Sequence, residues 1–319
     1  MMLSRVADSL YWMSRYLERA EHIARVVNVN LNVTLDRAPA DAARHWGHLL
    51  SALPPPPPFE RKTEANPQQR QTLDLANRES IGACISSARE NARQVREEIS
   101  SEMWEELNRL FLAIQRAQPT ESEWSAGTHE FLSSTITGVH LFQGVTDATM
   151  THGEGWHFIE LGRFLERGAN TAALLDVQYR EFHGDAESPR GVSEYVEWVG
   201  ALKSCCAFEA YCRHYTADLR PMRIAEFLVL NAEFPRSIRF AAARVQSSLK
   251  SLAGITGRVN GRAERLAGRL IASLDYGQID EIFSTLPDYL LDIVRQANQI
   301  GSAVHQQYIA YPVDRELAG

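Results

Sequence analysis

Charged side chains that could do chemistry occur twice in the chain with the same spacing. The first copy reads Arg-Tyr-Leu-Glu-Arg at residues 15–19, and the second reads Arg-Phe-Leu-Glu-Arg at residues 163–167, an offset of 148 residues. The charged members are Arg15, Glu18, Arg19, Arg163, Glu166 and Arg167. A glutamate between two arginines stays ionised and leaves guanidinium N–H groups over for another anion. The motif therefore suits either a carboxylate or phosphate ligand, or ion pairs within the protein.

Each copy extends into a stripe on one face of a predicted helix. At 100° per residue, an arc of about 100° collects the following side chains. The first stripe holds Ser4, Asp8, Tyr11, Arg15, Glu18, Arg19 and His22, and the second holds His152, Trp156, Ile159, Arg163, Glu166, Arg167 and Asn170. The spacings of three and four residues from Glu18 to Arg15 and His22 allow contacts within the helix. The copies differ, since His22 corresponds to Asn170.

Four interpretations of these stripes are open from the sequence. A charged stripe on an amphipathic helix is usually a solvated face that contributes little to stability. It can also be a buried ion network that locks two parts of a protein together. A third interpretation is a ligand site in which the arginines face an acid or a phosphate, and a fourth is catalysis by these side chains.

The elements that position the stripes are helices. Apolar residues recur with the helical period along almost the whole chain, and no convincing alternating strand pattern occurs. We expect helices over residues 3–36, 40–53, 80–100, 102–116, 120–149, 156–182, 192–216, 222–230, 236–254, 258–276 and 287–309. Residues 54–72 begin with five consecutive prolines and predict a solvated loop. The predicted fold class is all-α.

A second internal sequence similarity supports a duplication. Ser80-Ile81 returns as Ser237-Ile238 at an offset of 157 residues, in the same order along the chain as the charged motif. We therefore expect two homologous multi-helix bundle halves, residues 1–150 and 151–319, packed with pseudo-twofold symmetry into one continuous unit.

Composition excludes several classes of function. The 319 residues include 33 basic and 40 acidic side chains, a net charge of −7, which argues against binding to nucleic acid or to an anionic membrane surface. No apolar run is long enough to span a bilayer, and the first residues do not read as a signal peptide. Four cysteines without a CxxC pair indicate reduced thiols. The expected location is the cytoplasm.

Motifs for nucleotide, metal or nucleophilic chemistry are absent from the sequence. It contains no G-x-x-x-x-G-K-[S/T], G-x-G-x-x-G, H-E-x-x-H or G-x-S-x-G pattern. We accordingly expect no cofactor and no metal site in this chain.

The opening residues 3–13, together with residues 15–21, resemble the bacterial alpha-E domain family, an all-helical family named for its Glu-Arg motif. The similar stretches elsewhere are residues 88–93, which include Arg89, Glu90 and Asn91, and residues 99–105, 155–156, 160–163 and 233–237. The resemblance covers essentially the whole chain. The proline run at 54–58 departs from the family's pattern.

The resemblance implies a role without an established catalytic activity. The family is associated with circularly permuted ATP-grasp proteins and transglutaminase-like proteins, which implies a system that makes, and can cut, amide or peptide bonds. This chain would be its non-catalytic accessory or adaptor protein, binding the ligase, its peptide substrate or both. The alternative is an enzyme with an Arg/Glu-lined pocket at the pseudo-twofold interface, acting on an acidic or acyl-phosphate substrate. A structural dimer subunit is a third possibility, and the sequence does not predict the oligomeric state.

Overall fold

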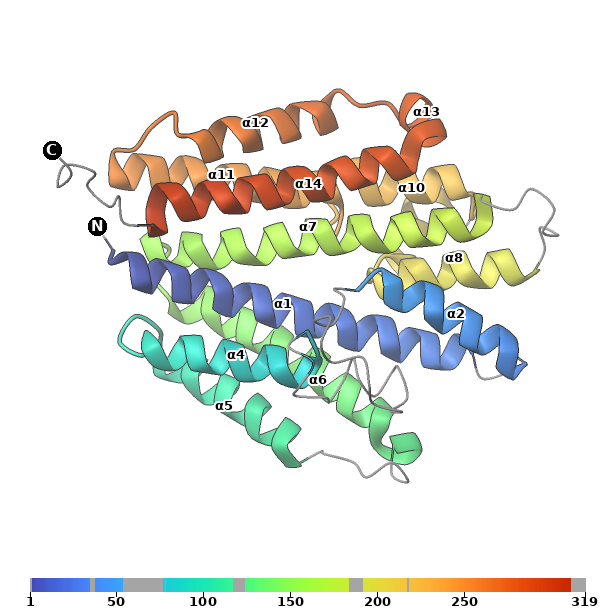
Figure 1. The fold of residues 1–319 in the computed structure, drawn as a ribbon, viewed down its shortest axis with the longest axis horizontal. Helices are drawn as coiled ribbons and strands as arrows, with labels where there is room; N and C mark the ends of the chain where they lie inside the picture. Colours follow the sequence, from blue (N-terminus) through green and yellow to red (C-terminus); the bar gives the residue numbers. More distant parts are fainter. Residues whose placement is uncertain are drawn as a thin grey trace, which may run out of the picture.

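The computed structural model describes residues 2–34, 38–53, 77, 79–116, 124–183, 192–216 and 218–310. Within these ranges the chain is helical and contains no β-strand, which confirms the predicted all-α fold (Figure 1). The proline-rich loop predicted over residues 54–72 lies outside the described residues, as do residues 120–123, where a helix start was predicted. Among the described residues, no helix combines the length and the apolar composition that crossing a bilayer requires.

Two long helices form the centre of the molecule and run side by side in the same direction (Figure 1). They are α1 (Ser4–Val33) and α7 (Glu154–His183), of 30 residues each, or about 45 Å at 1.5 Å per residue. Their first turns lie together, since the backbone N–H of Met2 donates to Glu154 Oε2 at 2.8 Å. Apolar and charged residues of both helices are buried, because other helices cover them on several sides.

Each central helix belongs to a ring of four packed helices. The helices of the first ring are α1, α4 (Ile81–Gln94), α5 (Ser101–Arg116) and α6 (Trp124–Thr149). The helices of the second ring are α7, α11 (Ile238–Thr256), α12 (Arg262–Asp275) and α14 (Leu286–Val304). In both rings the successive helices pack against one another and the last returns to the first. Two four-helix bundles therefore meet along α1 and α7.

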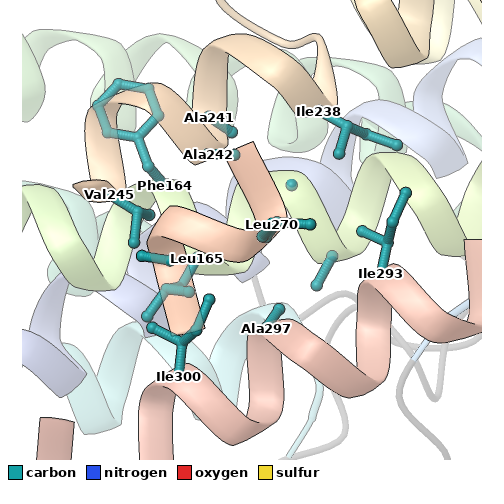
Figure 2. Close-up of a pocket in the computed structure, with 13 residues that line it drawn as sticks. Phe164, Leu165, Ile238, Ala241, Ala242, Val245, Leu270, Ile293, Ala297 and Ile300 are labelled. Atoms are coloured by element: carbon teal, nitrogen blue, oxygen red, sulfur yellow. The ribbon is translucent and has the colours of Figure 1, made fainter. Parts of the chain in front are cut away.

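The interior of the second bundle is apolar and nearly filled. Side chains from α7, α11, α12 and α14 surround a cavity with room for water centres of only about 20 Å³ (Figure 2). Its lining includes Phe164, Val245, Leu270 and Ile300. A space of this size lined by apolar groups offers no hydrogen-bond partners and does not attract water. It is a packing feature of the core and not a substrate site.

The remaining helical segments are shorter. They are α2 (Pro39–Ser51), α8 (Val192–Ser204), α9 (Phe208–Tyr215), α10 (Pro221–Leu230), α13 (Ile279–Ile282), the 3₁₀ turn Phe283–Thr285 and the π-helical turn His305–Ile309. Helix α2 packs on α7, and α8 packs on α1. The buried His45 of α2 lies 3.3 Å from Glu197 Oε1 of α8 and 3.0 Å from Asn30 Oδ1 of α1. These polar contacts join α2 to α8 and to α1.

The helix predicted over residues 192–216 is wrong as a single element. It breaks into α8 and α9 around Cys206, whose φ of 52° is left-handed. The backbone N–H of Ala207 then donates to the carbonyl of Leu202 at 2.7 Å and closes the end of α8. A left-handed residue costs an L-amino acid about 1–2 kcal/mol, so periodicity alone gave no reason to place a break there.

Gly162 sets how closely α1 and α7 approach. A Cβ atom at this position would overlap Ser14 Oγ and the backbone carbonyl oxygen of Tyr11 on α1. We expect Gly162→Ala to lower the free energy of unfolding by about 1–3 kcal/mol, because the two central helices must move apart. Gly144 of α6 is the matched control: nothing lies near its Cβ position, so Gly144→Ala should stabilise the helix by about 0.5–1 kcal/mol. Urea unfolding of both variants measures the difference, and equal effects would refute the close-contact argument.

Candidate functional site

The two Arg-Glu motifs face each other where α1 and α7 pack together. Arg19 Nε donates to Glu166 Oε1 at 2.6 Å, and Arg167 Nε donates to Glu18 Oε1 at 2.6 Å. The pairs cross between the helices, so the contacts from Glu18 to Arg15 and His22 that the spacing within α1 allowed are not the ones that form. Each helix supplies the arginine for the other helix's glutamate.

One side of the contact is the Glu166 cluster, formed by Arg15, Arg19, Glu79 and Glu166. Both Nε and Nη2 of Arg15 lie 2.7 Å from Glu166 Oε2, and Arg15 Nη1 donates to the hydroxyl of Tyr11 at 3.1 Å. Arg19 also pairs with Glu79, which precedes α4. Two guanidinium groups thus meet two carboxylates, and the cluster is balanced in charge.

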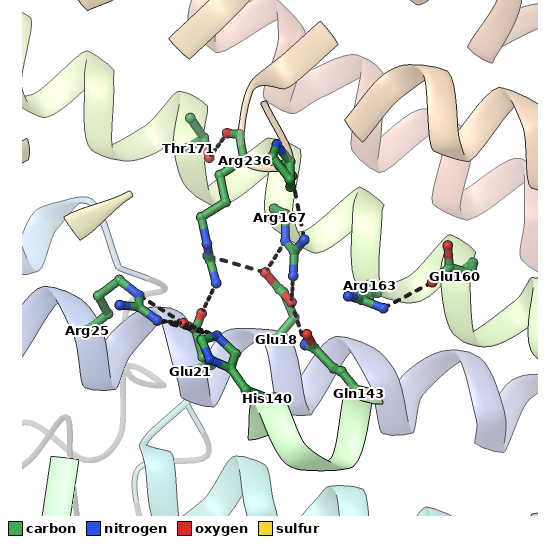
Figure 3. Close-up of polar contacts among 11 residues, drawn as sticks. Glu18, Glu21, Arg25, His140, Gln143, Glu160, Arg163, Arg167, Thr171 and Arg236 are labelled. Carbon is green, nitrogen blue, oxygen red and sulfur yellow. Dashed lines mark hydrogen bonds and ion pairs between the residues drawn. The ribbon is translucent and has the colours of Figure 1, made fainter. Parts of the chain in front are cut away.

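The other side is the Glu18 cluster, which centres on Glu18 and Glu21 of α1 (Figure 3). Arg167 Nη2 donates to Glu18 Oε2 at 2.7 Å, and Gln143 of α6 donates to the same oxygen at 3.2 Å. Arg236, just before α11, lies 2.7 Å from Glu21 Oε2 and 3.6 Å from Glu18 Oε1. One guanidinium therefore bridges two buried carboxylates.

The end of the Glu18 cluster reaches towards α6. Arg25 Nε donates to Glu21 Oε1 at 2.8 Å, and His140 Nε2 lies 3.4 Å from the same oxygen. The hydroxyl of Thr171 on α7 donates to the backbone carbonyl of Arg236 at 3.0 Å and holds that residue against the central helices.

Arg163 does not occupy the position that the repeat predicts. Its counterpart Arg15 donates hydrogen bonds to Glu166. Arg163 instead points to Glu160, one turn earlier on its own helix, and its Nη1 donates to Glu160 Oε1 at 3.2 Å (Figure 3). Glu160 also pairs with Arg244 of α11. Glu18, which would be the mirror partner of Arg163, already accepts hydrogen bonds from Arg167 and Gln143.

Burial and charge act in opposite directions on the pKa of each glutamate. Glu18 and Glu166 are 1% and 3% exposed. Burial by itself would raise the pKa of Glu18, but Arg167 and Arg236 outweigh it and hold that pKa below its usual value. Arg15 and Arg19 do the same for the pKa of Glu166. The carboxylates are therefore ionised at neutral pH and occupied by guanidinium donors.

His22 is buried and carries no charge at neutral pH. Burial lowers its pKa to about 4 against the opposing effect of Glu21, and its Nε2 has no hydrogen-bond partner among the described residues. Burial also raises the pKa of Asp8, whose Oδ1 is buried without a hydrogen-bond partner within the same ranges. Both residues lie on the predicted stripe of α1, but neither joins the ion pairs.

His152 and Trp156 lie at the start of α7, away from the exchanged pairs. Their rings stack at 4.1 Å between centroids, and Arg244 lies 5.8 Å from the centroid of Trp156. His152 Nε2 also lies 3.1 Å from the backbone carbonyl of Asp147. These two residues thus border the Arg163–Glu160–Arg244 contact.

The three candidates Arg89, Glu90 and Asn91 do not join the site. Arg89 donates to Asn108 Oδ1 at 2.7 Å and lies on the ring of Phe111, so it packs α4 against α5. Glu90 forms an exposed ion pair with Arg93, and Asn91 donates to the backbone of Ser87. These side chains serve the packing and the surface of the first bundle.

Several residues of the network were missed by the sequence analysis. They are Glu21, Arg25, Glu79, His140, Gln143, Glu160, Arg236 and Arg244. A signal existed for two of them, since the offset of 157 residues that relates Ser80 to Ser237 also relates Glu79 to Arg236. Both precede a serine that caps a helix, accepting from Ala83 N at 3.2 Å and from Phe240 N at 3.1 Å.

The space beside the network is small. A cavity between α1, α6 and α7, lined by Ser14, Gln143 and Arg163 among others, has room for water centres of about 10 Å³. This is the size of a single water site. No group of three or more His, Cys, Asp or Glu side chains in the described part of the chain is arranged to hold a metal ion.

We expect loss of one partner of an exchanged pair to be strongly destabilising. Arg167→Ala leaves Glu18 buried without its main counter-charge, which should lower the free energy of unfolding by about 3–5 kcal/mol. The double variant Arg167→Ala/Glu18→Ala should recover part of that loss, because the stranded charge is gone. Arg93→Ala, which breaks an exposed pair, is the control and should leave the free energy of unfolding nearly unchanged. Equal effects of Arg167→Ala and Arg93→Ala would show that the network is not structural.

His22 makes the fold sensitive to acid in a defined range. Because its pKa in the folded protein is about 4 and its ordinary value is 6.5, the unfolded chain binds the proton first. Stability from His22 is complete above pH 6.5 and is lost as the pH falls towards 4, by about 2 kcal/mol at pH 5. The carboxylates Glu18, Glu21 and Glu166 have lowered pKa values, so their contribution is lost only below their ordinary value of 4.5.

The measurement is the free energy of unfolding of the wild type and of His22→Asn between pH 7 and pH 5. Asparagine is the matched replacement because Asn170 holds the corresponding position on α7. The variant should lose less stability over this interval. Parallel curves for the two proteins would contradict a neutral, buried His22.

The model of the family Alpha-E, described as a predicted alpha-helical domain with a conserved ER motif, matches residues 2–309. Uncharacterized proteins of Mycobacterium bovis and Mycobacterium tuberculosis are each 24% identical to this chain over 306 residues, which covers 90% of it and 34% of the relative. The chain therefore spans about a third of the length of these curated relatives. No solved structure matches the chain significantly.

Proposed function

Because the chain belongs to the Alpha-E family, we propose that it is a non-catalytic helical adaptor of a cytoplasmic, ATP-grasp-linked system that forms amide or peptide bonds. It binds the ligase, the peptide substrate or both. Its proposed partners are a circularly permuted ATP-grasp protein and a transglutaminase-like protein. The chain contributes a rigid helical surface, and the nucleotide chemistry belongs to the partner.

The observation that carries this proposal is the occupation of the motif's carboxylates. A general base needs an accessible lone pair and a pKa close to the working pH. Glu18 and Glu166 are buried, accept hydrogen bonds from arginines, and have lowered pKa values. His22, whose pKa is strongly shifted, lines neither internal cavity described above. This favours a structural role for the motif over the alternative of an enzyme acting through it.

The length of the relatives gives independent support. About two thirds of each mycobacterial relative lies outside the region matched by this chain. A unit that forms part of a longer polypeptide in these relatives is suited to act beside a partner. Such a partner can be joined covalently or bound non-covalently.

We also propose that residues 1–150 and 151–319 are duplicated halves related by a pseudo-twofold axis between α1 and α7. The ion pairs Arg19–Glu166 and Arg167–Glu18 support this, because a twofold rotation turns one pair into the other. The two rings of four helices have the same order of packing, and α2 and α8 each cross to the opposite central helix. The halves then differ in their joining segments, since α9, α10 and α13 have no counterpart among the described residues of the first half, and in the side chains around the shared pairs.

The adaptor proposal predicts a complex and no turnover by this chain alone. The chain would be purified and mixed with the circularly permuted ATP-grasp protein from the same genome, and light scattering after size exclusion would give the mass. We expect a stoichiometric complex, and we expect ATP consumption by the ligase with peptide substrates to rise when this chain is added.

The controls are each protein alone with ATP. Absence of a complex, or release of phosphate from ATP by this chain without the ligase, would overturn the proposal.

A further inference from the structure

Arg163 is a member of the repeated motif whose only ion-pair partner in the described part of the chain, Glu160, is shared with another arginine, Arg244. Arg15, at the corresponding position, donates with three of its nitrogens to Glu166 and Tyr11. Arg163 makes one contact of 3.2 Å to Glu160, and its buried Nε has no acceptor among the described residues. The two arginines also differ in the direction of their pKa shifts. Glu166 raises the pKa of Arg15 against the effect of burial, whereas burial lowers the pKa of Arg163.

The side of α7 that carries Arg163 has more arginines than glutamates. In the ion pairs formed there by the described residues, the guanidinium groups are those of Arg25, Arg163, Arg167, Arg236 and Arg244, and the carboxylates are those of Glu18, Glu21 and Glu160. Five positive groups thus share three negative ones, whereas the Glu166 cluster pairs two with two. His157 adds no charge, because burial lowers its pKa.

The excess charge lies where solvent reaches it. Arg167 and Arg236 are 5% and 10% exposed, but the side chains of Arg163 and Arg244 are 23% and 41% exposed. These two arginines share the single carboxylate of Glu160, which is 3% exposed. An anion arriving from solvent therefore meets two guanidinium groups with one counter-charge between them.

Aromatic rings fix the positions of these guanidinium groups. Arg163, Arg167 and Arg244 lie 5.3, 5.1 and 5.5 Å from the centroid of Phe164, and Arg244 also contacts Trp156. Cation–π contacts hold the arginines without neutralising them. The N–H groups thus stay available to an oxygen ligand, and a planar fork of this kind suits a carboxylate or a phosphate.

We propose that Arg163 and Arg244 bind an oxyanion, a carboxylate or phosphate group, beside Trp156 at the surface where α7 meets α11. This inference goes beyond the adaptor role, because it concerns a ligand that the chain binds by itself. A carboxylate would come from an acidic peptide, and a phosphate from a free or nucleotide-derived phosphate. The corresponding surface around Arg15 lacks such a site, since Glu166 and Tyr11 take the nitrogens of that arginine.

Calorimetric titration of the full chain at pH 7 tests the site with two probes, triglutamate and sodium phosphate. We expect at least one of them to bind, and Arg163→Gln and Arg244→Gln to weaken that binding about tenfold or more, as loss of a charged hydrogen bond does. Arg244→Gln keeps the test usable if Arg163→Gln fails to fold, because Arg244 is the more exposed. Arg269→Gln, the same charge loss at an exposed position of α12, should bind as the wild type does.

Glu160→Gln gives the opposite expected change. It removes the internal carboxylate that competes for both arginines, so the probe should bind more tightly in a variant whose circular dichroism is unchanged. Binding of triglutamate alone assigns the site to a carboxylate, binding of phosphate alone assigns it to a phosphate, and binding of both supports the shared oxyanion chemistry. Binding of neither probe, or wild-type affinity in both Arg163→Gln and Arg244→Gln, would overturn the site. These outcomes do not depend on whether a ligase binds the chain.

Discussion

The exchange of arginines between α1 and α7 is the interaction on which the rest of the structure depends. A carboxylate taken out of water costs several kcal/mol unless donors of opposite charge surround it. Glu18 and Glu166 meet that condition only when each lies beside the arginine of the other helix. The exchanged pairs therefore specify the axial register and the relative direction of the two central helices. Gly162 permits the close approach that those distances need. The ion pairs thus fix the register between the central helices of the two bundles.

Charge is distributed unevenly around this shared centre. Among the described residues, one side has as many carboxylates as guanidinium groups, and the other has more guanidinium groups. The Glu166 cluster pairs its guanidinium groups and carboxylates one to one and is largely closed to solvent. The Glu18 cluster continues through Arg236 and Glu21. Next to it on α7, the half-buried Arg163 and the exposed Arg244 share the carboxylate of Glu160. A buried pair with both partners present holds a geometry but offers nothing to a ligand. Uncompensated charge at a surface attracts one, which is why the two similar motifs have different expected roles.

The family's Glu-Arg motif can thus be understood as a device for assembling a helical platform. Replacing such ion pairs by apolar residues can leave stability unchanged or raise it, so their value lies in specifying one arrangement over others. For the proposed adaptor, a platform of defined shape would be the useful property. The polar contacts of His45 with Glu197 and Asn30 serve the same end, because they join α2 to α8 and to α1.

The sequence by itself determined the all-α class, most helix boundaries and the residues at the centre of the network, because helical periodicity and a repeated five-residue motif are local signals. It did not determine which arginine pairs with which glutamate. The spacing within one helix allows contacts inside that helix, but in the packed structure the pairs form between α1 and α7. Cys206 could not be placed at a helix break, because left-handed backbone in a non-glycine residue is stabilised only by its surroundings. The roles of Arg236, Gln143 and Arg244 depend on helices far apart in the chain. Only tertiary packing decides how a buried charge is neutralised, since its cost depends on every group that surrounds it.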